Sequence, residues 1–195
     1  MKKSLRLSLL MLGAMSLLPI SVFAHPAVGE TTGFGLGFGH PIGGADHLLA
    51  MLAVGLWAAQ MGGRAIWAVP SAFVTLMIFG GSLAVAGIHL PYVEEGIVVS
   101  VLVFGLLIAA TFKFSATVSA FIVGVFAVFH GQAHGAEMPL AIGAISYVLG
   151  FASGTALLHA AGIAGGIILQ KMNIERAVRF AGGAIAIAGA CLAVA

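Results

Sequence analysis

Apolar stretches of membrane-spanning length recur along almost the whole of this 195-residue chain. A helix needs about 20 predominantly apolar residues to cross the hydrocarbon core of a bilayer. Charged residues make up only 7% of the sequence, too few to cover a water-soluble surface. The sequence therefore predicts an all-α, polytopic membrane helical bundle of about six transmembrane helices. They cover approximately Pro41–Gln60, Ala65–Gly87, Glu95–Thr111, Ser115–Ala133, Leu140–Leu158 and Ala177–Val194.

The interval from Leu140 to Leu169 leaves the number of helices open. It is too long for one upright helix in a membrane of ordinary thickness. A seventh span can be drawn there, or His159-Ala-Ala-Gly162 can mark a break, a tilt or a helix that continues past the membrane edge.

The N-terminus has a different character from the later apolar segments. Lys2, Lys3 and Arg6 precede the apolar stretch from Leu7 to Leu18, and Val22-Phe23-Ala24 follows it. This order predicts a cleaved secretory signal peptide over residues 1–24, followed by a single transmembrane helical-bundle domain over residues 25–195. An uncleaved first helix is the alternative, although the apolar stretch is short for a span.

The cations predict how the bundle is oriented. Once the signal peptide is removed, all the remaining Lys and Arg residues fall in alternate connections between the predicted spans, as the positive-inside rule expects of cytoplasmic loops. They are Arg64, Lys113, Lys171, Arg176 and Arg179. The mature N-terminus is then outside, which a signal peptide also requires. The sequence pI near 9.0 belongs partly to the signal peptide and predicts no nucleic-acid partner.

The first polar motif, FGHPIGGADHLLAM, lies at the mouth of the first predicted span. A continuous helix would place His40 and His47 on one face, because they are seven residues apart. Pro41 and the Gly43-Gly44 pair instead predict a bent or unwound start, where imidazoles, the Asp46 carboxylate and free carbonyls can converge. An acidic group at the end of a span is costly and usually marks a function.

The second polar motif, FHGQAHGAEMP, begins at the outer end of the fourth predicted span and continues past it. His130, His134 and Glu137 are spaced by four and three residues, so a helix puts all three on one stripe that can hold a divalent ion. The single cysteine, Cys191, cannot build a thiolate cage. Imidazole with carboxylate suits Ni²⁺, Co²⁺, Zn²⁺, Mn²⁺ or Fe²⁺, and the spacing does not choose among them.

Three further histidines carry weaker predictions. If cleavage follows Ala24, His25 offers an α-amino group and an imidazole that together can capture a divalent ion, although a disordered terminus is the default for such a position. His89 and His159 are interpreted as hydrogen-bonded or interfacial groups rather than as metal ligands.

These motifs closely resemble the HupE/UreJ family of bacterial nickel permeases. The resemblance rests on HPAVG after the signal peptide, on GHPIGGADHLLAMLAVGLWA and on FHGQAHGAEMP, and it covers essentially the whole mature chain. It implies a carrier or facilitator in the bacterial inner membrane, with its mature N-terminus in the periplasm, that supplies Ni²⁺ for hydrogenase or urease. It also implicates His40, Asp46, His47 and Glu137 in transport, and His130 and His134 by the same match.

The resemblance makes the metal ion a transported substrate rather than a prosthetic group, with the lipid bilayer as the other partner. The sequence leaves open whether the protein forms a homo-oligomer. No GxxxxGK[ST] loop for ATP and no HExxH motif are present in the sequence, and we expect no enzymatic activity. A permease for cobalt or another divalent metal is one alternative, and a metal-dependent intramembrane hydrolase or a non-transporting metal sensor is the alternative from another class.

Overall fold

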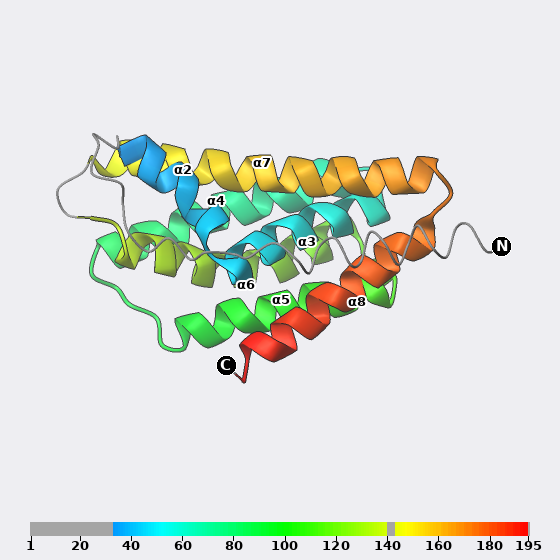
Figure 1. Cartoon of the computed structure of the whole chain (residues 1–195). Coiled ribbons are helices and arrows are strands. Elements are labelled where there is room, and N and C mark those ends of the chain that lie inside the picture. Colours follow the sequence, from blue (N-terminus) through cyan, green and yellow to red (C-terminus); the bar gives the residue numbers. More distant parts are fainter. Residues whose placement is uncertain (1–32, 140–142, 195) are drawn as a thin grey trace.

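The computed structural model describes residues 33–139 and 143–194, which form seven α-helices and no β-strand within those ranges. The predicted all-α membrane bundle is thereby confirmed, while the predicted signal peptide and His25 lie outside the described residues. The helices are α2 (Gly33–Gly43), α3 (Ala45–Met61), α4 (Ala65–Val85), α5 (Val93–Ala109), α6 (Ala116–Ala136), α7 (Ala144–Lys171) and α8 (Glu175–Leu192) (Figure 1).

Each of the six predicted spans overlaps one long helix, although the first begins within α2 and continues into α3. The helices differ in how well they suit a membrane. By length and composition, α4, α6 and α7 can each cross a bilayer alone, and the bent pair of α2 and α3 makes up to a fourth span in the described residues. Large apolar side chains face outward, among them Trp67, Phe121 and Phe180, each more than half exposed. Such a surface suits contact with lipid.

Helix α7 is continuous through the segment His159–Gly162, so the break considered there is wrong. Its 28 residues rise about 42 Å at 1.5 Å each, against a hydrocarbon core of about 30 Å. The helix must therefore tilt in the membrane or extend past its edge. The extra helix of the bundle is α2, on the N-terminal side of the first predicted span.

Glycines let the helices approach backbone to backbone. A Cβ added at Gly131 of α6 would collide with the carbonyl oxygen of Met77 in α4, and one at Gly37 of α2 would collide with that of Tyr147 in α7. In the same way, Gly105 of α5 leaves room only for the backbone of α8. Close approach through small residues is how helices associate without a hydrophobic driving force between them.

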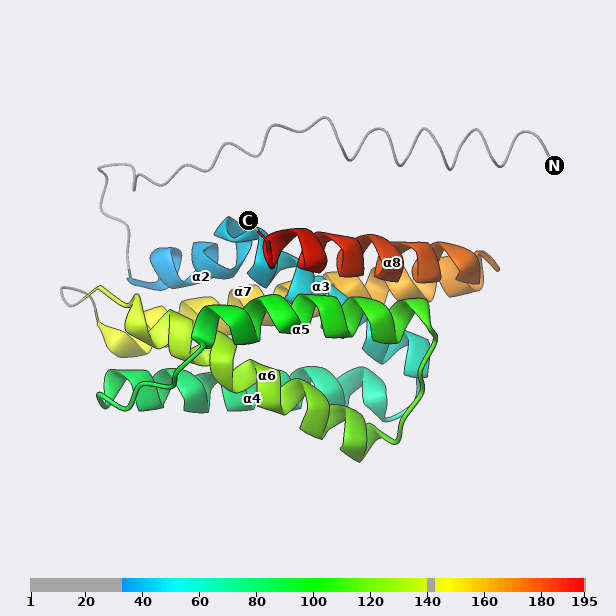
Figure 2. The same ribbon diagram turned by 90° about the horizontal axis from the view of Figure 1, so that it is seen from below.

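The connections between helices divide the bundle into two ends. The turns after α3, α5 and α7 lie together at one end, which we call the basic end; it carries Arg64, Lys113 and Lys171 (Figure 1). The connections after α4 and α6 lie at the opposite, acidic end, with Glu94 and Glu137 (Figures 1 and 2). This separation is the one that the sequence predicts for the two sides of a membrane.

Candidate metal site

The first motif forms a sharp break between two helices. Helices α2 and α3 meet at Gly44 with a bend of 82°, so the predicted bent start is confirmed and a continuous helix through both histidines is excluded. His40 lies in the last turn of α2, and Asp46 lies in the first turn of α3. A Cβ at Gly44 would stand 2.7 Å from the Asp46 carboxylate oxygen. The absent side chain at Gly44 therefore gives this carboxylate room to turn inward.

Asp46 fixes the orientation of the neighbouring imidazole. Its Oδ1 atom accepts a hydrogen bond from the His47 backbone N–H at 2.7 Å and lies 3.0 Å from His47 Nδ1. Because a carboxylate only accepts, Nδ1 carries the hydrogen in this contact. In the neutral ring the lone pair is then on Nε2, which is buried and has no hydrogen-bond partner. Asp46 thus leaves His47 with one nitrogen free to bind a cation.

Ser100, which lies outside both motifs, fixes the orientation of the His130 imidazole. The Ser100 hydroxyl of α5 donates to the Ile97 carbonyl at 2.6 Å and lies 2.9 Å from His130 Nε2. Since its one hydrogen goes to Ile97, the serine oxygen accepts from His130 Nε2–H. The lone pair of the neutral ring is then on Nδ1, which is buried without a partner.

His134 is the least supported polar group of the site. Its ring stacks on Phe151 of α7, with centroids 4.8 Å apart and planes 3° from parallel, and neither ring nitrogen has a hydrogen-bond partner. The fourth predicted span ends at Ala133 and so leaves His134 outside the membrane-spanning part, and that placement is wrong. Helix α6 continues to Ala136, so His134 lies inside the bundle and is fully buried.

His40 and Glu137 form the outermost pair of the site. His40 Nε2 lies 3.0 Å from Glu137 Oε2, and the two side chains are 26% and 57% exposed. Glu137 caps the C-terminal end of α6, so this contact joins the two motifs. The pair stands at the acidic end and remains open to solvent.

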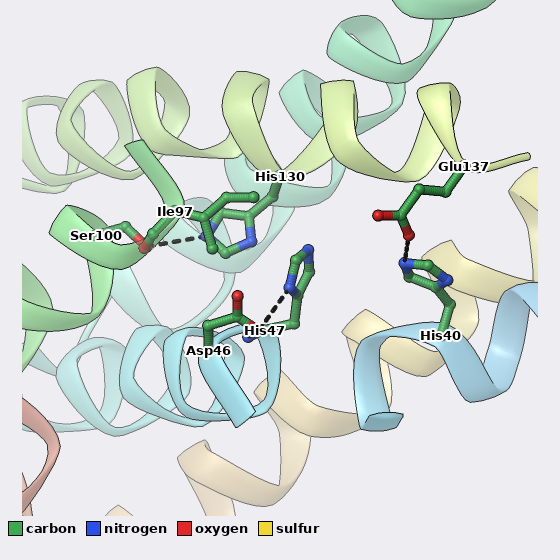
Figure 3. A network of polar contacts seen from close by, with 7 residues as sticks. All are labelled: His40, Asp46, His47, Ile97, Ser100, His130 and Glu137. Atoms are coloured by element: carbon green, nitrogen blue, oxygen red, sulfur yellow. Dashed lines mark hydrogen bonds and ion pairs between the residues drawn. The ribbon is translucent and has the colours of Figure 1, made fainter. Parts of the chain in front are cut away.

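The four imidazoles form one group, which we call the histidine cluster: His40, His47, His130 and His134. The His47 centroid lies 4.8 Å from that of His130 and 4.9 Å from that of His134, and His40 lies 4.7 Å from His134. Figure 3 shows His47 between His130 on one side and the His40–Glu137 pair on the other. The structure therefore brings together six of the seven predicted metal ligands.

The histidine cluster is not a closed metal cage. In the described parts of the chain, no three His, Cys, Asp or Glu side chains surround one point closely enough to hold an ion as they stand. Nitrogen ligands lie about 2.0–2.1 Å from a metal such as zinc, closer than the present ring spacing allows for a full set. Binding at this site requires the imidazoles to rotate inward.

The sequence did not predict the two residues that hold histidines of the cluster in place, Ser100 and Phe151. Ser100 is a polar residue within an apolar run, which is the one signal that could have singled it out, but which histidine it faces depends on how α5 packs on α6. Phe151 carries no signal beyond its apolarity. His89, which lies between the second and third predicted spans, and Glu95, at the start of the third, are exposed at the acidic end.

Comparison with known proteins extends the resemblance to nearly the full chain. Residues 12–192 match the family described as HupE / UreJ protein. Protein HupE of Rhizobium leguminosarum bv. viciae is 44% identical over 185 residues, which cover 92% of this chain and 95% of that protein. No solved structure matches. On this similarity, together with the two histidine motifs that the fold brings into contact, the chain belongs to the HupE/UreJ family.

Proposed function

We propose that this protein is a bacterial inner-membrane permease that takes up divalent transition-metal ions, foremost Ni²⁺, from the periplasm into the cytoplasm for the maturation of hydrogenase or urease. The observation that carries the proposal is the set of unpartnered nitrogens on His47, His130 and His134. Leaving a buried polar group without a partner costs about 1–3 kcal/mol. Three such rings, with the His47 centroid 4.8 Å and 4.9 Å from the centroids of the other two, favour a site that binds a cation.

The donor chemistry favours a transition metal. Neutral imidazole suits nickel, zinc, copper and iron, whereas Mg²⁺ and Ca²⁺ prefer oxygen ligands alone. Imidazole and carboxylate would also accept Co²⁺, so the choice of Ni²⁺ rests on the resemblance to the nickel permeases of the family. An incomplete ligand set, completed by water, suits an ion that must be released again.

The distribution of charge supports the direction of transport. The positive-inside rule places the basic end in the cytoplasm, so the acidic end, with Glu137 beside His40, faces the periplasm. An entering ion then moves down the membrane potential, which contributes about 2.3 kcal/mol per charge per 100 mV and roughly twice that for a divalent ion. If residues 1–24 are removed on export, His25 becomes the N-terminal residue on the same side and adds a further capture group.

The test is uptake into proteoliposomes of Ni²⁺, Co²⁺, Zn²⁺, Fe²⁺ and Mn²⁺ by the wild type and by His134→Phe. This substitution keeps an aromatic ring against Phe151 but removes both donor nitrogens. We expect selective Ni²⁺ uptake by the wild type and its loss in the variant, with unfolding at the same or a higher temperature because the unpartnered nitrogens are gone.

The matched control is His89→Phe, which replaces an exposed histidine of the acidic end and should leave uptake unchanged. Undiminished uptake by His134→Phe would refute a role for the histidine cluster. Ion binding without flux by the wild type would point to a metal sensor, and metal-dependent hydrolysis of a peptide or ester substrate would point to an enzyme.

A further inference from the structure

A fourth buried histidine, His159, lies outside the histidine cluster and deeper in the bundle. His159 of α7 is 1% exposed, and neither of its ring nitrogens has a hydrogen-bond partner. Its ring meets that of Phe73 edge-on, with centroids 5.1 Å apart. A core histidine is ordinarily hydrogen-bonded, and an apolar ring would fill the same space without the cost of unpaired nitrogens. Packing alone therefore does not account for an imidazole at this position.

One face of α7 connects the cluster to His159. Tyr147, Phe151, Thr155 and His159 follow one another at intervals of four residues, and all four are buried, so they form a stripe that faces the core. The Tyr147 ring lies 6.3 Å from that of His40, and Phe151 stacks on His134. Two further turns, about 12 Å of helix rise, lead from Phe151 to His159.

Helix α4 packs against the same stripe of α7 through Phe73 and Met77. The Phe73 ring lies 5.4 Å from that of His130 and 5.1 Å from that of His159, so it separates the cluster from the deeper histidine. One turn of α4 further along, the Met77 sulfur lies 3.6 Å from the Thr155 hydroxyl oxygen. Both are fully buried. A thioether and a hydroxyl thus stand one turn of α7 from the imidazole.

Next to His159, the backbones of α3 and α7 lie in direct contact. A Cβ added at Gly55 of α3 would collide with the His159 carbonyl oxygen, and one at Gly162 of α7 would collide with the Leu52 carbonyl oxygen. Gly162 continues the buried stripe of α7 three residues after His159. His159 is therefore the last polar side chain on this stripe before α3 and α7 meet backbone to backbone.

We propose that His159 is the centre of a second, inner metal site, which receives the ion from the histidine cluster. Thr155 Oγ1, one turn of α7 from His159, and Met77 Sδ, 3.6 Å from that oxygen, are the further donors of this site, and water completes the coordination. The proposal rests on the permease function proposed above. Imidazole with a thioether selects for nickel and softer ions over Mg²⁺ and Mn²⁺. A site with a single imidazole also binds more weakly than the cluster, which suits onward release.

The first experiment asks whether an ion reaches this position. In a Cys191→Ser background, which removes the only native cysteine, His159→Cys places a thiolate on the stripe. Purified protein is titrated with Co²⁺, whose thiolate complexes absorb in the near ultraviolet whereas its imidazole complexes do not. We expect a saturable band in His159→Cys and none in Val101→Cys, a fully buried position of α5 that lies outside this stripe of α7.

A second reporter guards against a variant that fails to fold. Thr155→Cys changes the side chain little and leaves His159 in place, so it should give the same band. Absence of the band in both reporters would overturn the inner site. The absorption band measures binding and not transport. It therefore tests the inner site even if the wild type moves no metal and the permease proposal itself is wrong.

The second experiment asks whether the inner site lies on the transport route. His159→Phe should lower the initial rate of Ni²⁺ uptake by at least about tenfold, the lower end of the losses seen when groups around a metal site are removed. Equilibrium binding of the first ion, which occurs at the histidine cluster, should not change. A Co²⁺ band in the cysteine reporters with full uptake by His159→Phe would place the site off the route and overturn the relay.

Discussion

The two histidine motifs contribute to the same site from different local structures, one from a break between two helices and the other from a continuous helix. The first interrupts its helix, and the 82° bend at Gly44 turns Asp46 and His47 inward together. The second lies on an unbroken helix, α6, whose His130 and His134 are fully buried in the bundle wall. The broken segment supplies a carboxylate along with its rings, whereas the buried part of α6 supplies only neutral nitrogens.

The difference follows the cost of burying charge. Glu137, at the end of α6, is 57% exposed, and Asp46, at the break, is 22% exposed. His130 and His134, which are fully buried, carry no charge as neutral rings. A buried carboxylate needs a partner and nearby water far more than a neutral ring does. The carboxylates of the candidate site therefore lie nearer its exposed side, and the imidazoles of α6 lie in the interior.

The largest effect is expected from removing the ring that links the two motifs. His47 lies between His130 and the His40–Glu137 pair, so His47→Ala should separate the two halves of the site. We expect Ni²⁺ affinity to fall by more than the roughly 10–100-fold that follows the loss of an outer partner of a metal ligand. Titration of purified protein measures it, with His89→Ala as the control. A loss below tenfold would mean that the second motif binds alone.

The next largest effect should come from Asp46→Asn, which keeps the shape of the side chain but removes the charge that orients His47. We expect Ni²⁺ affinity to fall by about 10–100-fold. The matched control is Glu175→Gln, an acidic residue in the first turn of α8 at the basic end, which should bind as the wild type does. Equal affinity in the two variants would contradict the role of the break in supplying the carboxylate.

A smaller loss is expected when the support of His130 is removed. Ser100→Ala takes away the oxygen that accepts from His130 Nε2–H. The ring hydrogen can then move to Nδ1, so that Nδ1 no longer offers a lone pair to a metal ion. Affinity should fall by about tenfold. Ser119→Ala serves as the control, because this buried serine contacts the Met61 sulfur rather than a histidine. If both variants bind alike, the orientation of His130 does not depend on α5.

The smallest effect is expected from Glu137→Gln. An exposed ion pair contributes only about 0.2–1 kcal/mol, which corresponds to a change of at most about fivefold. Capture of the ion should slow by no more than this, and its rate should depend less on ionic strength because a charge at the entrance is gone. Rates of uptake at low and high salt measure both. A loss as large as that of Asp46→Asn would show that Glu137 moves inward and becomes a ligand.

The sequence predicts the helices well because their signal is local. Apolar length alone places the six predicted spans, and Pro41 with Gly43-Gly44 predicts the bend before α3. The candidate ligands are also local, since both motifs can be recognised from residue type and spacing. His134 is misplaced in depth because the predicted span ends three residues before α6 does. The interpretation of His159 as a hydrogen-bonded or interfacial group is also wrong, since its ring is buried and has no hydrogen-bond partner in the described residues.

The supports of the site could not be predicted, because they depend on how helices pack. Ser100 meets His130 only through the register of α5 against α6, and Phe151 meets His134 only through that of α7. His159 carries no motif, and its significance appears only once its two nitrogens are seen to be buried without partners. Close approach at glycines sets these registers, and a sequence with 28 glycines does not say which of them face a neighbouring helix.

The meeting of α3 and α7 at Gly55 and Gly162 has a consequence for kinetics. Main chain pressed against main chain leaves no room for an ion between α3 and α7 at this level, so an ion on the proposed route could not pass there as it does through an open channel. Each passage needs the two helices to part and to rejoin, and collective helix motions of this kind take microseconds to milliseconds. Flux should therefore saturate as the external ion concentration rises, with a turnover limited by the bundle itself rather than by diffusion.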